Sequence, residues 1–257
     1  MKSTVLTAFR IVHSLPEQKS HFLFLENNLK SDPLFNPNLR ALLFDLDGTL
    51  IDSAPDIAAA INTLLAWKSH PALTLDQVRS MIGNGVRVLV GRAFTFRNDM
   101  PNEDRLNELT SEMMGIYADN LTNLTVPMAQ ADALLIAVRQ KGLKMGLVTN
   151  KPEVFSREIL AHFKWDHYFE SVVGGDTCPD RKPAPSMLFH ACSELGVKPE
   201  TAIMVGDSPA DIDSAKNATM KSIAVFGGYT NIAADKLGAD LVVNDLGEIL
   251  SHILEID

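Results

Sequence analysis

Short apolar runs that alternate with helical patterns are the feature that most constrains the fold of this chain. The runs are 41–44, 144–149, 171–174, 202–205, 222–226 and 241–243. Between them, apolar residues recur at helical spacing, as in 187–195, where Gly196 is expected to end the helix. Short apolar strands alternating with helices are typical of a parallel sheet covered on both faces. The sequence therefore predicts an α/β fold with a doubly wound, mostly parallel sheet.

A second region, between the first strand and residue 128, has helical spacing only. Ser53–Asp56 and Thr74–Gln77 have the form of capping boxes, so each is expected to begin a helix. Gly83 is expected to end the second of these helices, and Asn102 to cap a later one. The pattern indicates a small α-helical domain inserted into the α/β fold.

These patterns divide the chain into three parts. We expect an N-terminal extension at 1–39, an α/β core formed by 40–53 and 128–257, and an inserted helical domain at 54–127. Three explanations of the extension stay open: a targeting segment, a packed or frayed arm, and a start codon assigned too early.

The composition of the chain limits the kinds of binding partner that it is expected to have. The net charge is -9 and the isoelectric point is near 5.2, which argues against nucleic acid or an anionic membrane as the main partner. No stretch approaches the roughly 20 apolar residues that span a bilayer. The two cysteines, Cys178 and Cys192, are too few for a disulfide framework or a zinc cluster, so free thiols in a reducing, cytoplasmic setting are expected. Both a monomer and a homodimer remain open.

Polar clusters follow the predicted strands. Asp45 and Asp47 come directly after the first strand, and a side-chain period of two places both carboxylates on the same side. The other clusters are Thr149-Asn150-Lys151-Pro152, Arg181-Lys182-Pro183-Ala184-Pro185 and Gly206-Asp207-Ser208-Pro209-Ala210-Asp211. Strand ends of such a sheet converge on one crevice. Carboxylates, a hydroxyl and an ammonium group in one crevice suit a phosphoryl group together with Mg²⁺.

These four clusters, in this order, resemble the motifs of the haloacid dehalogenase superfamily of phosphohydrolases over roughly residues 40–257. Within that superfamily, four segments most resemble phosphoglycolate phosphatases: Phe44–Ile57, Met81–Gly85, Val148–Pro152 and Gly174–Pro185. The resemblance implies a Mg²⁺-dependent hydrolase, with the inserted helices forming a cap over the crevice.

The resemblance also implies residue roles. Asp45 is expected to be the nucleophile that forms an aspartyl-phosphate, and Asp47 the general acid and then the general base. Mg²⁺ is expected to bind Asp45, the backbone carbonyl of Asp47 and Asp207, with Asp211 supporting the site. Phosphate binding is assigned to Thr149, Asn150 and Lys182, where Asn150 acts through its backbone N–H.

In the helical insertion, Gly83-Asn84-Gly85 is expected either to present backbone N–H groups to a substrate carboxylate or to form a plain turn between helices. Arg92 follows on the next helix and is a candidate partner for a carboxylate. Thr219 occupies a position where the resembled family usually has glycine, so the turn there is expected to differ or to be strained.

The function expected from the resemblance is hydrolysis of a small phosphate monoester, 2-phosphoglycolate or a similar small acid. Alternatives are a phosphatase, pyrophosphatase or phosphomutase for another small phosphate such as a sugar phosphate. A catalytically silent binding module on the same fold is a further alternative. Lys68–Pro71 departs from the glycine-containing stretch expected there and bears on the choice of substrate.

Overall fold

A six-stranded parallel sheet forms the centre of the fold in the computed structural model, which describes residues 34–35 and 38–255. The strand order is β5-β4-β1-β6-β7-β8. The strands are β1 (Ala41–Phe44), β4 (Lys144–Val148), β5 (Ser171–Val173), β6 (Ala202–Gly206), β7 (Lys221–Val225) and β8 (Leu241–Val243). The predicted α/β fold with a parallel sheet is thus confirmed. The expectations for the N-terminal extension fall almost entirely outside the described residues.

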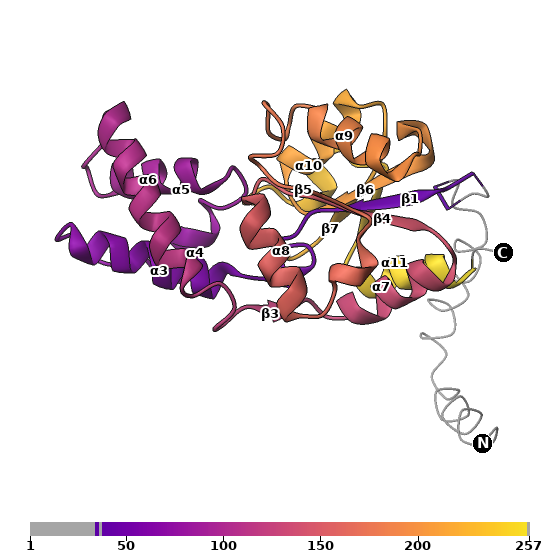
Figure 1. Cartoon of the computed structure of the whole chain (residues 1–257), viewed down its shortest axis with the longest axis horizontal. Coiled ribbons are helices and arrows are strands. Elements are labelled where there is room, and N and C mark those ends of the chain that lie inside the picture. Colours follow the sequence, from indigo (N-terminus) through magenta and orange to yellow (C-terminus); the bar gives the residue numbers. More distant parts are fainter. Residues whose placement is uncertain (1–33, 36–37, 256–257) are drawn as a thin grey trace, which may run out of the picture. The chain divides into compact units, whose positions relative to one another are not determined.

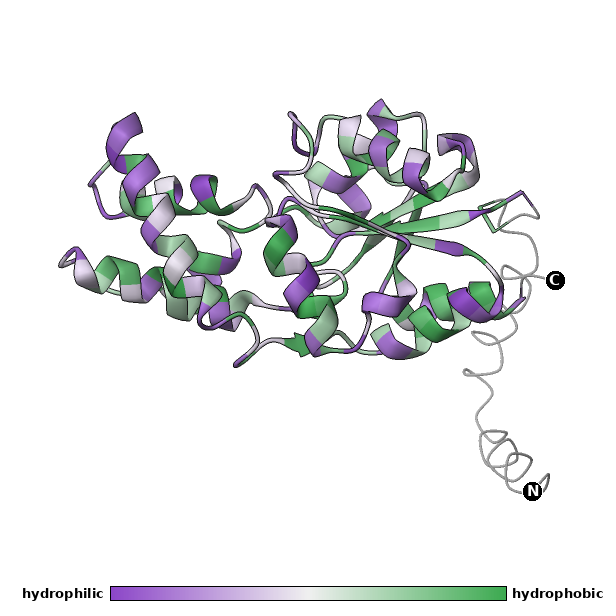
Figure 2. Cartoon of the chain, in the orientation of Figure 1, coloured by the Kyte–Doolittle hydropathy of each residue, from purple (hydrophilic) through white to green (hydrophobic). Residues whose placement is uncertain are grey.

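Helices cover both faces of the sheet, with α9 and α10 on one face and α7 and α11 on the other (Figure 1). The helices of this part are α7 (Ala131–Gln140), α8 (Glu153–His162), α9 (Ser186–Leu195), α10 (Pro209–Asn217) and α11 (Leu246–Glu255), and the short 3-10 helices are Asp166–Tyr168, Pro199–Thr201 and Ala234–Lys236. All four residues of β1 are fully buried, which explains why the strand is apolar throughout rather than alternating. In Figure 2 the central strands are largely hydrophobic, whereas the helices carry both kinds of residue.

The register of β1 decides where the polar clusters meet. Phe44, the last residue of β1, lies opposite Leu147 of β4 on one side and Val205 of β6 on the other. The chain segments that follow these three parallel strands therefore leave the sheet at the same edge. Because β4 and β6 flank β1, this is the point at which an open α/β sheet leaves a crevice for a ligand.

The helical insertion holds four helices: α3 (Ala54–Trp67), α4 (Leu75–Arg79), α5 (Val86–Phe96) and α6 (Glu103–Ala118). Two short strands connect it to the sheet, β2 (Ile51–Asp52) and β3 (Val126–Pro127), and they pair antiparallel with Ile51 opposite Pro127. This two-stranded ribbon was not predicted, because two residues are too few to show a period. The predicted caps at Thr74 and Asn102 are confirmed, since their side chains accept the backbone N–H of Gln77 and Arg105 respectively.

Two details of the helical prediction are wrong. Ser53 precedes α3 but its side chain makes no capping hydrogen bond, and Asp56 does not return to it. Ser53 Oγ instead donates to Asp47, and Asp56 accepts the backbone N–H groups of Leu124 and Thr125. Ser53 and Asp56 thus bond to residues outside the helix instead of to each other. The second error concerns α4, which ends at Arg79 rather than at Gly83.

Two further findings concern bilayer-spanning helices and thiols. Within residues 34–35 and 38–255, no helix combines the length and the apolar composition needed to cross a membrane. Cys178 and Cys192 are both free thiols, as expected.

Thr219 ends α10 in the left-handed conformation, with φ of 56°. The backbone N–H of Met220 donates to Ala215 and that of Thr219 donates to Lys216, the two bonds of a Schellman motif. The motif normally takes glycine at this position, because a Cβ is strained at positive φ. The turn at Thr219 therefore keeps the usual geometry of a glycine turn, and the threonine is strained in it.

We expect Thr219→Gly to raise the free energy of unfolding by about 0.5–1 kcal/mol, because relief of left-handed strain exceeds the added entropy of glycine in the unfolded chain. Denaturant titration followed by circular dichroism measures the change. Thr219→Ala is the matched control, since alanine retains the Cβ and should give no comparable gain. Equal stability of the alanine and glycine variants would contradict the strain argument.

Candidate active site

Three buried carboxylates meet at the carboxyl edge of the sheet. Asp45 follows β1, Asp207 follows β6, and Asp211 lies in the first turn of α10. One carboxylate oxygen from each lies within 4.8 Å of the others. Like charges so close together are unfavourable unless a cation or a proton offsets their repulsion.

Lys182 supplies a buried positive charge to this cluster. Its Nζ donates to Asp45 Oδ1 at 2.8 Å, to Asp211 Oδ1 at 2.5 Å and to the backbone carbonyl of Val148 at 2.6 Å. An ammonium group has three donors, so all three are used. The loop before α9 thereby brings the predicted lysine directly onto the predicted nucleophile.

Burial shifts the pKa values of two of these carboxylates upward, even with Lys182 beside them. Burial raises the pKa of Asp45 to about 6, against the opposing charge of Lys182. Burial, reinforced by Asp211 and Asp45, raises the pKa of Asp207 well above its ordinary value. Burial lowers the pKa of Lys182, but Asp211 and Asp45 outweigh it and bring that pKa to about 12. Either a bound proton or a cation would therefore offset the repulsion in this cluster.

Close backbone approach shapes the space around Asp207. A Cβ on Gly48, whose φ is 88°, would come within 2.8 Å of Asp207 Oδ2, and one on Gly228 within 2.1 Å. Thr49 Oγ1 donates to Asp207 Oδ1 at 3.2 Å, and the backbone N–H of Tyr229 donates to Oδ2 at 2.7 Å. Only glycine fits at positions 48 and 228. The close backbone and the two hydrogen bonds together hold the Asp207 carboxylate in one place.

The donor set suits a hard divalent cation. The three side chains offer oxygen atoms only, and they are buried together. Mg²⁺ prefers oxygen ligands and is commonly held by one or two carboxylates with water completing its shell. Asp211, expected only to support the site, lies in the cluster itself and also accepts the Ser208 hydroxyl and N–H. The Asp47 carboxylate is not one of the three.

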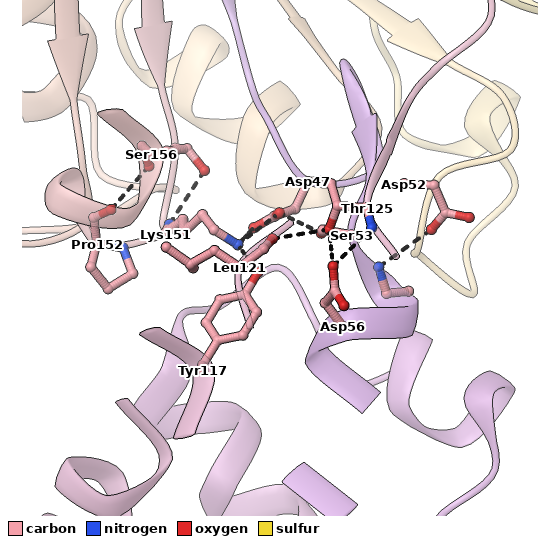
Figure 3. A network of polar contacts seen from close by, with 12 residues as sticks. Asp47, Asp52, Ser53, Asp56, Tyr117, Leu121, Thr125, Lys151, Pro152 and Ser156 are labelled. Carbon is pink, nitrogen blue, oxygen red and sulfur yellow. Dashed lines mark hydrogen bonds and ion pairs between the residues drawn. The ribbon is translucent and has the colours of Figure 1, made fainter. Parts of the chain in front are cut away.

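Asp47 lies beside the cluster and has its own partners, shown in Figure 3. Lys151 Nζ lies 3.0 Å from Asp47 Oδ1 and 3.2 Å from Oδ2, and Ser53 Oγ donates to Oδ1 at 2.5 Å. Lys151 was not among the predicted site residues. Lys151 belongs to the Thr149–Pro152 cluster that the sequence pattern picks out. The direction of its side chain cannot be inferred from the sequence.

Tyr117 connects this pair to the helical insertion. Lys151 Nζ donates to the Tyr117 hydroxyl at 2.6 Å and lies 4.6 Å from the centre of its ring. Burial raises the pKa of Tyr117 to about 12, so the hydroxyl stays protonated near neutral pH. Helix α6 thus reaches the side chain that faces Asp47 (Figure 3).

Asn150 joins three segments through its side-chain amide. Its Nδ2 donates to the carbonyls of Gly83 at 2.9 Å and Lys182 at 3.1 Å, while its Oδ1 accepts the Lys182 N–H at 3.0 Å. The amide therefore positions the Lys182 loop and contacts the helical insertion. Thr149 is buried beside it and lines the same small pocket as Asp45 and Asp47.

The loop between α4 and α5 faces the crevice. Gly83 offers its carbonyl to Asn150, so the observed contact is not made by the expected N–H groups. Arg92 donates to the carbonyl of Met81 and to Asn84 Oδ1, which ties the loop to α5. Asn84 and Arg92 line a cavity of about 300 Å³ that Asp47 and Asp207 also line. Gly85 caps the start of α5 with φ of 85°, and a Cβ there would lie 2.8 Å from Arg181 Nη1.

We expect Mg²⁺ to raise the thermal unfolding temperature, and to raise it more at about pH 7.5 than at about pH 5. Mg²⁺ binds ionised carboxylates, and the Asp45 pKa is about 6, so protons compete with the cation below that pH. Scanning calorimetry with and without MgCl₂ measures the shift. Asp207→Asn is the control and should lose it. An equal shift in that variant would count against this cation site.

The family described as haloacid dehalogenase-like hydrolase matches residues 42–225. "Phosphoglycolate phosphatase 1" of Pseudomonas aeruginosa is 37% identical over 226 residues, which cover 86% of this chain and 82% of that protein. "Phosphoglycolate phosphatase" of Psychrobacter arcticus is 34% identical over 220 residues, covering 83% and 95%.

This chain is also similar to a protein of solved structure. The crystal structure of a predicted phosphoglycolate phosphatase from Haemophilus somnus 129PT superposes with a TM-score of 0.79 at 32% sequence identity. The match covers 83% of this chain and 97% of that chain. The sheet, the carboxylate cluster and these similarities agree, and the chain belongs to the haloacid dehalogenase-like hydrolases.

Proposed function

We propose that this protein hydrolyses a small phosphate monoester through an aspartyl-phosphate on Asp45. The proposed substrate is 2-phosphoglycolate. The observation that carries the proposal is the contact of Lys182 Nζ with both Asp45 and Asp211, within a cluster that also contains Asp207. That arrangement offers a nucleophilic carboxylate, a fixed cation beside it and oxygen ligands for a divalent ion in one buried place.

Asp45 attacks the phosphorus atom, and the bond from phosphorus to the ester oxygen breaks. Asp47 gives its proton to the departing alkoxide, then accepts a proton from the water that attacks the aspartyl-phosphate. The second displacement releases inorganic phosphate and restores Asp45. The contacts of Asp47 with Lys151 and Ser53 support this assignment, because they hold its carboxyl at the crevice.

Mg²⁺ is the proposed cofactor, held by Asp45, Asp207 and the backbone carbonyl of Asp47, with Asp211 beside them. When bound, it supplies positive charge that offsets the negative charge on the transferring phosphoryl group. Lys182 supplies charge at the nucleophile itself, and Thr149 and the Asn150 backbone N–H are proposed to hydrogen-bond the phosphoryl oxygens. Because Asp45 has a pKa of about 6, added positive charge also keeps the nucleophile ionised.

We propose that residues 54–127 act as a cap domain over a core formed by 40–53 and 128–257. The contacts of Asn150 with Gly83 and of Lys151 with Tyr117 support this, since each joins a residue after β4 to the insertion. A cap that closes over the substrate excludes water and strengthens every charge interaction beneath it.

The choice of 2-phosphoglycolate rests on the named relatives and on Arg92. Arg92 lines the cavity shared with Asp47 and Asp207, and is the proposed partner of the substrate carboxylate. A phosphatase, pyrophosphatase or phosphomutase for another small phosphate is the alternative. We place the protein in the cytoplasm.

A substrate screen tests the proposal. Phosphate release from 2-phosphoglycolate is compared with release from glucose 6-phosphate and inorganic pyrophosphate, and β-glucose 1-phosphate is tested for isomerisation. We expect the highest kcat/KM with 2-phosphoglycolate and no turnover without Mg²⁺. A higher kcat/KM with any other compound would reassign the substrate, and no turnover of any of them would favour a silent binding module.

Asp45→Asn should abolish turnover while leaving the fold intact, because an amide cannot form the aspartyl-phosphate. Asp47→Asn should lower kcat by about 10²–10⁴-fold, the usual size of a general acid–base contribution. Steady-state kinetics and circular dichroism measure the two effects. Turnover by Asp45→Asn at the rate of the unmodified enzyme would refute the nucleophile assignment.

Lys151→Met should lower kcat by about 10- to 100-fold, because Asp47 then loses a charge-assisted contact on both carboxylate oxygens. Lys198→Met is the matched control, since Lys198 is an exposed lysine outside the site, and its kcat should not change. Equal kcat values for these two variants would show that Lys151 has no part in catalysis.

A further inference from the structure

Tyr229 is a buried residue that contacts both a carboxylate of the cluster and the first connection of the helical insertion. It lies after β7, and its backbone N–H donates to Asp207 Oδ2 at 2.7 Å. Its hydroxyl, at the far end of the side chain, reaches the segment Asp52–Ala54, where β2 ends and α3 begins.

The hydroxyl uses its full hydrogen-bonding capacity on that segment. It accepts the backbone N–H of Ser53 at 2.7 Å and that of Ala54 at 3.0 Å, and it donates to Asp52 Oδ1 at 2.7 Å. The first N–H groups of a helix have no partner within it, and here a side chain from the α/β part supplies one. Removing the hydroxyl would take this acceptor from the Ser53 N–H, whereas the Ala54 N–H would keep Asp52 Oδ1 at 3.3 Å.

The contacts continue into the insertion through Asp52. Its second oxygen, Oδ2, accepts from Arg79 at 3.0 Å, and Arg79 belongs to α4. Ser53, bound by the hydroxyl through its N–H, also donates its own Oγ to Asp47. A single tyrosine thus stands between Asp207 on one side and the catalytic Asp47 and helix α4 on the other.

The backbone before Tyr229 leaves little freedom for independent movement. A Cβ at Gly228 would lie 2.1 Å from Asp207 Oδ2, so this loop packs directly against the carboxylate. A cation that draws the carboxylates together fixes Asp207, and the 2.7 Å hydrogen bond carries that constraint to Tyr229.

We propose that Tyr229 is a positioning residue that couples cation binding at Asp207 to the connection Asp52–Ala54, and through it to the position of the helical insertion. The proposal rests on the cation site of the proposed function. Because coupling between two sites is reciprocal, a tyrosine that steadies the connection also strengthens cation binding.

Tyr229→Phe tests the coupling, because it keeps the backbone N–H and the ring and removes only the hydroxyl. Hydrogen–deuterium exchange at the Ser53 and Ala54 amides is followed by NMR with and without Mg²⁺, and Mg²⁺ affinity is measured by calorimetry. We expect Mg²⁺ to slow this exchange in the unmodified chain and not in the variant. Mg²⁺ affinity should fall by about 5-fold or more in the variant.

Two further variants complete the test. Asp52→Asn removes the charged partner of the hydroxyl at nearly constant volume, and should weaken the effect of Mg²⁺ on exchange if Tyr229→Phe does not fold. Tyr168→Phe, in the 3-10 helix Asp166–Tyr168, is the matched control and should behave as the unmodified chain does.

The outcomes separate this inference from the proposed function. Mg²⁺ binding with equal slowing of exchange in the unmodified chain and in Tyr229→Phe would overturn the coupling and leave the cation site intact. Failure of the unmodified chain to bind Mg²⁺ would overturn both. Coupling that persists in a protein inactive on 2-phosphoglycolate would support the inference and refute only the substrate.

Discussion

The burial of three carboxylates beside one lysine is the constraint on which the rest of this structure depends. Asp45, Asp207 and Asp211 come from two strand ends and a helix start, and Lys182 contacts two of them. Carboxylates buried this close destabilise a fold unless charge or protons compensate. Glycines at 48 and 228 allow the backbone to approach Asp207, and the grouped oxygens could hold a metal ion. Stability and chemistry therefore share the same residues here.

A second constraint is that the helical insertion touches the site through a few polar side chains. Asn150 binds Gly83, Lys151 binds Tyr117, and Tyr229 binds the connection before α3. Each joins a residue next to the carboxylate cluster to a residue in or beside the insertion. Polar contacts of this kind have defined geometry, so the position of the insertion bears on how Asn150 and Lys151 are held. Direct hydrogen bonds thus join the helical insertion to the candidate site.

Much of the fold was predictable because its signals are local. The buried β1 strand reads as the uninterrupted apolar run Ala41–Phe44, and the caps at Thr74 and Asn102 use side chains a few residues from their partners. The ribbon of β2 and β3 was not predictable, since it pairs Ile51 with Pro127 across the whole insertion. The false capping box at Ser53 failed for the same reason: Asp47 and Thr125 offered partners that the local pattern does not contain.

The amino-acid sequence alone determined the fold class and the order of the polar clusters, because the apolar runs of the strands are visible in one dimension. The candidates Asp45, Asp47, Lys182 and Asp207 came from the resemblance of these clusters to the family motifs. Only the tertiary structure decided that Asp211 joins the carboxylate cluster, that Lys151 turns toward Asp47, and that Tyr229 spans from Asp207 to Asp52. Those contacts join residues far apart in the chain, and the direction of a long side chain depends on neighbours that only folding brings together.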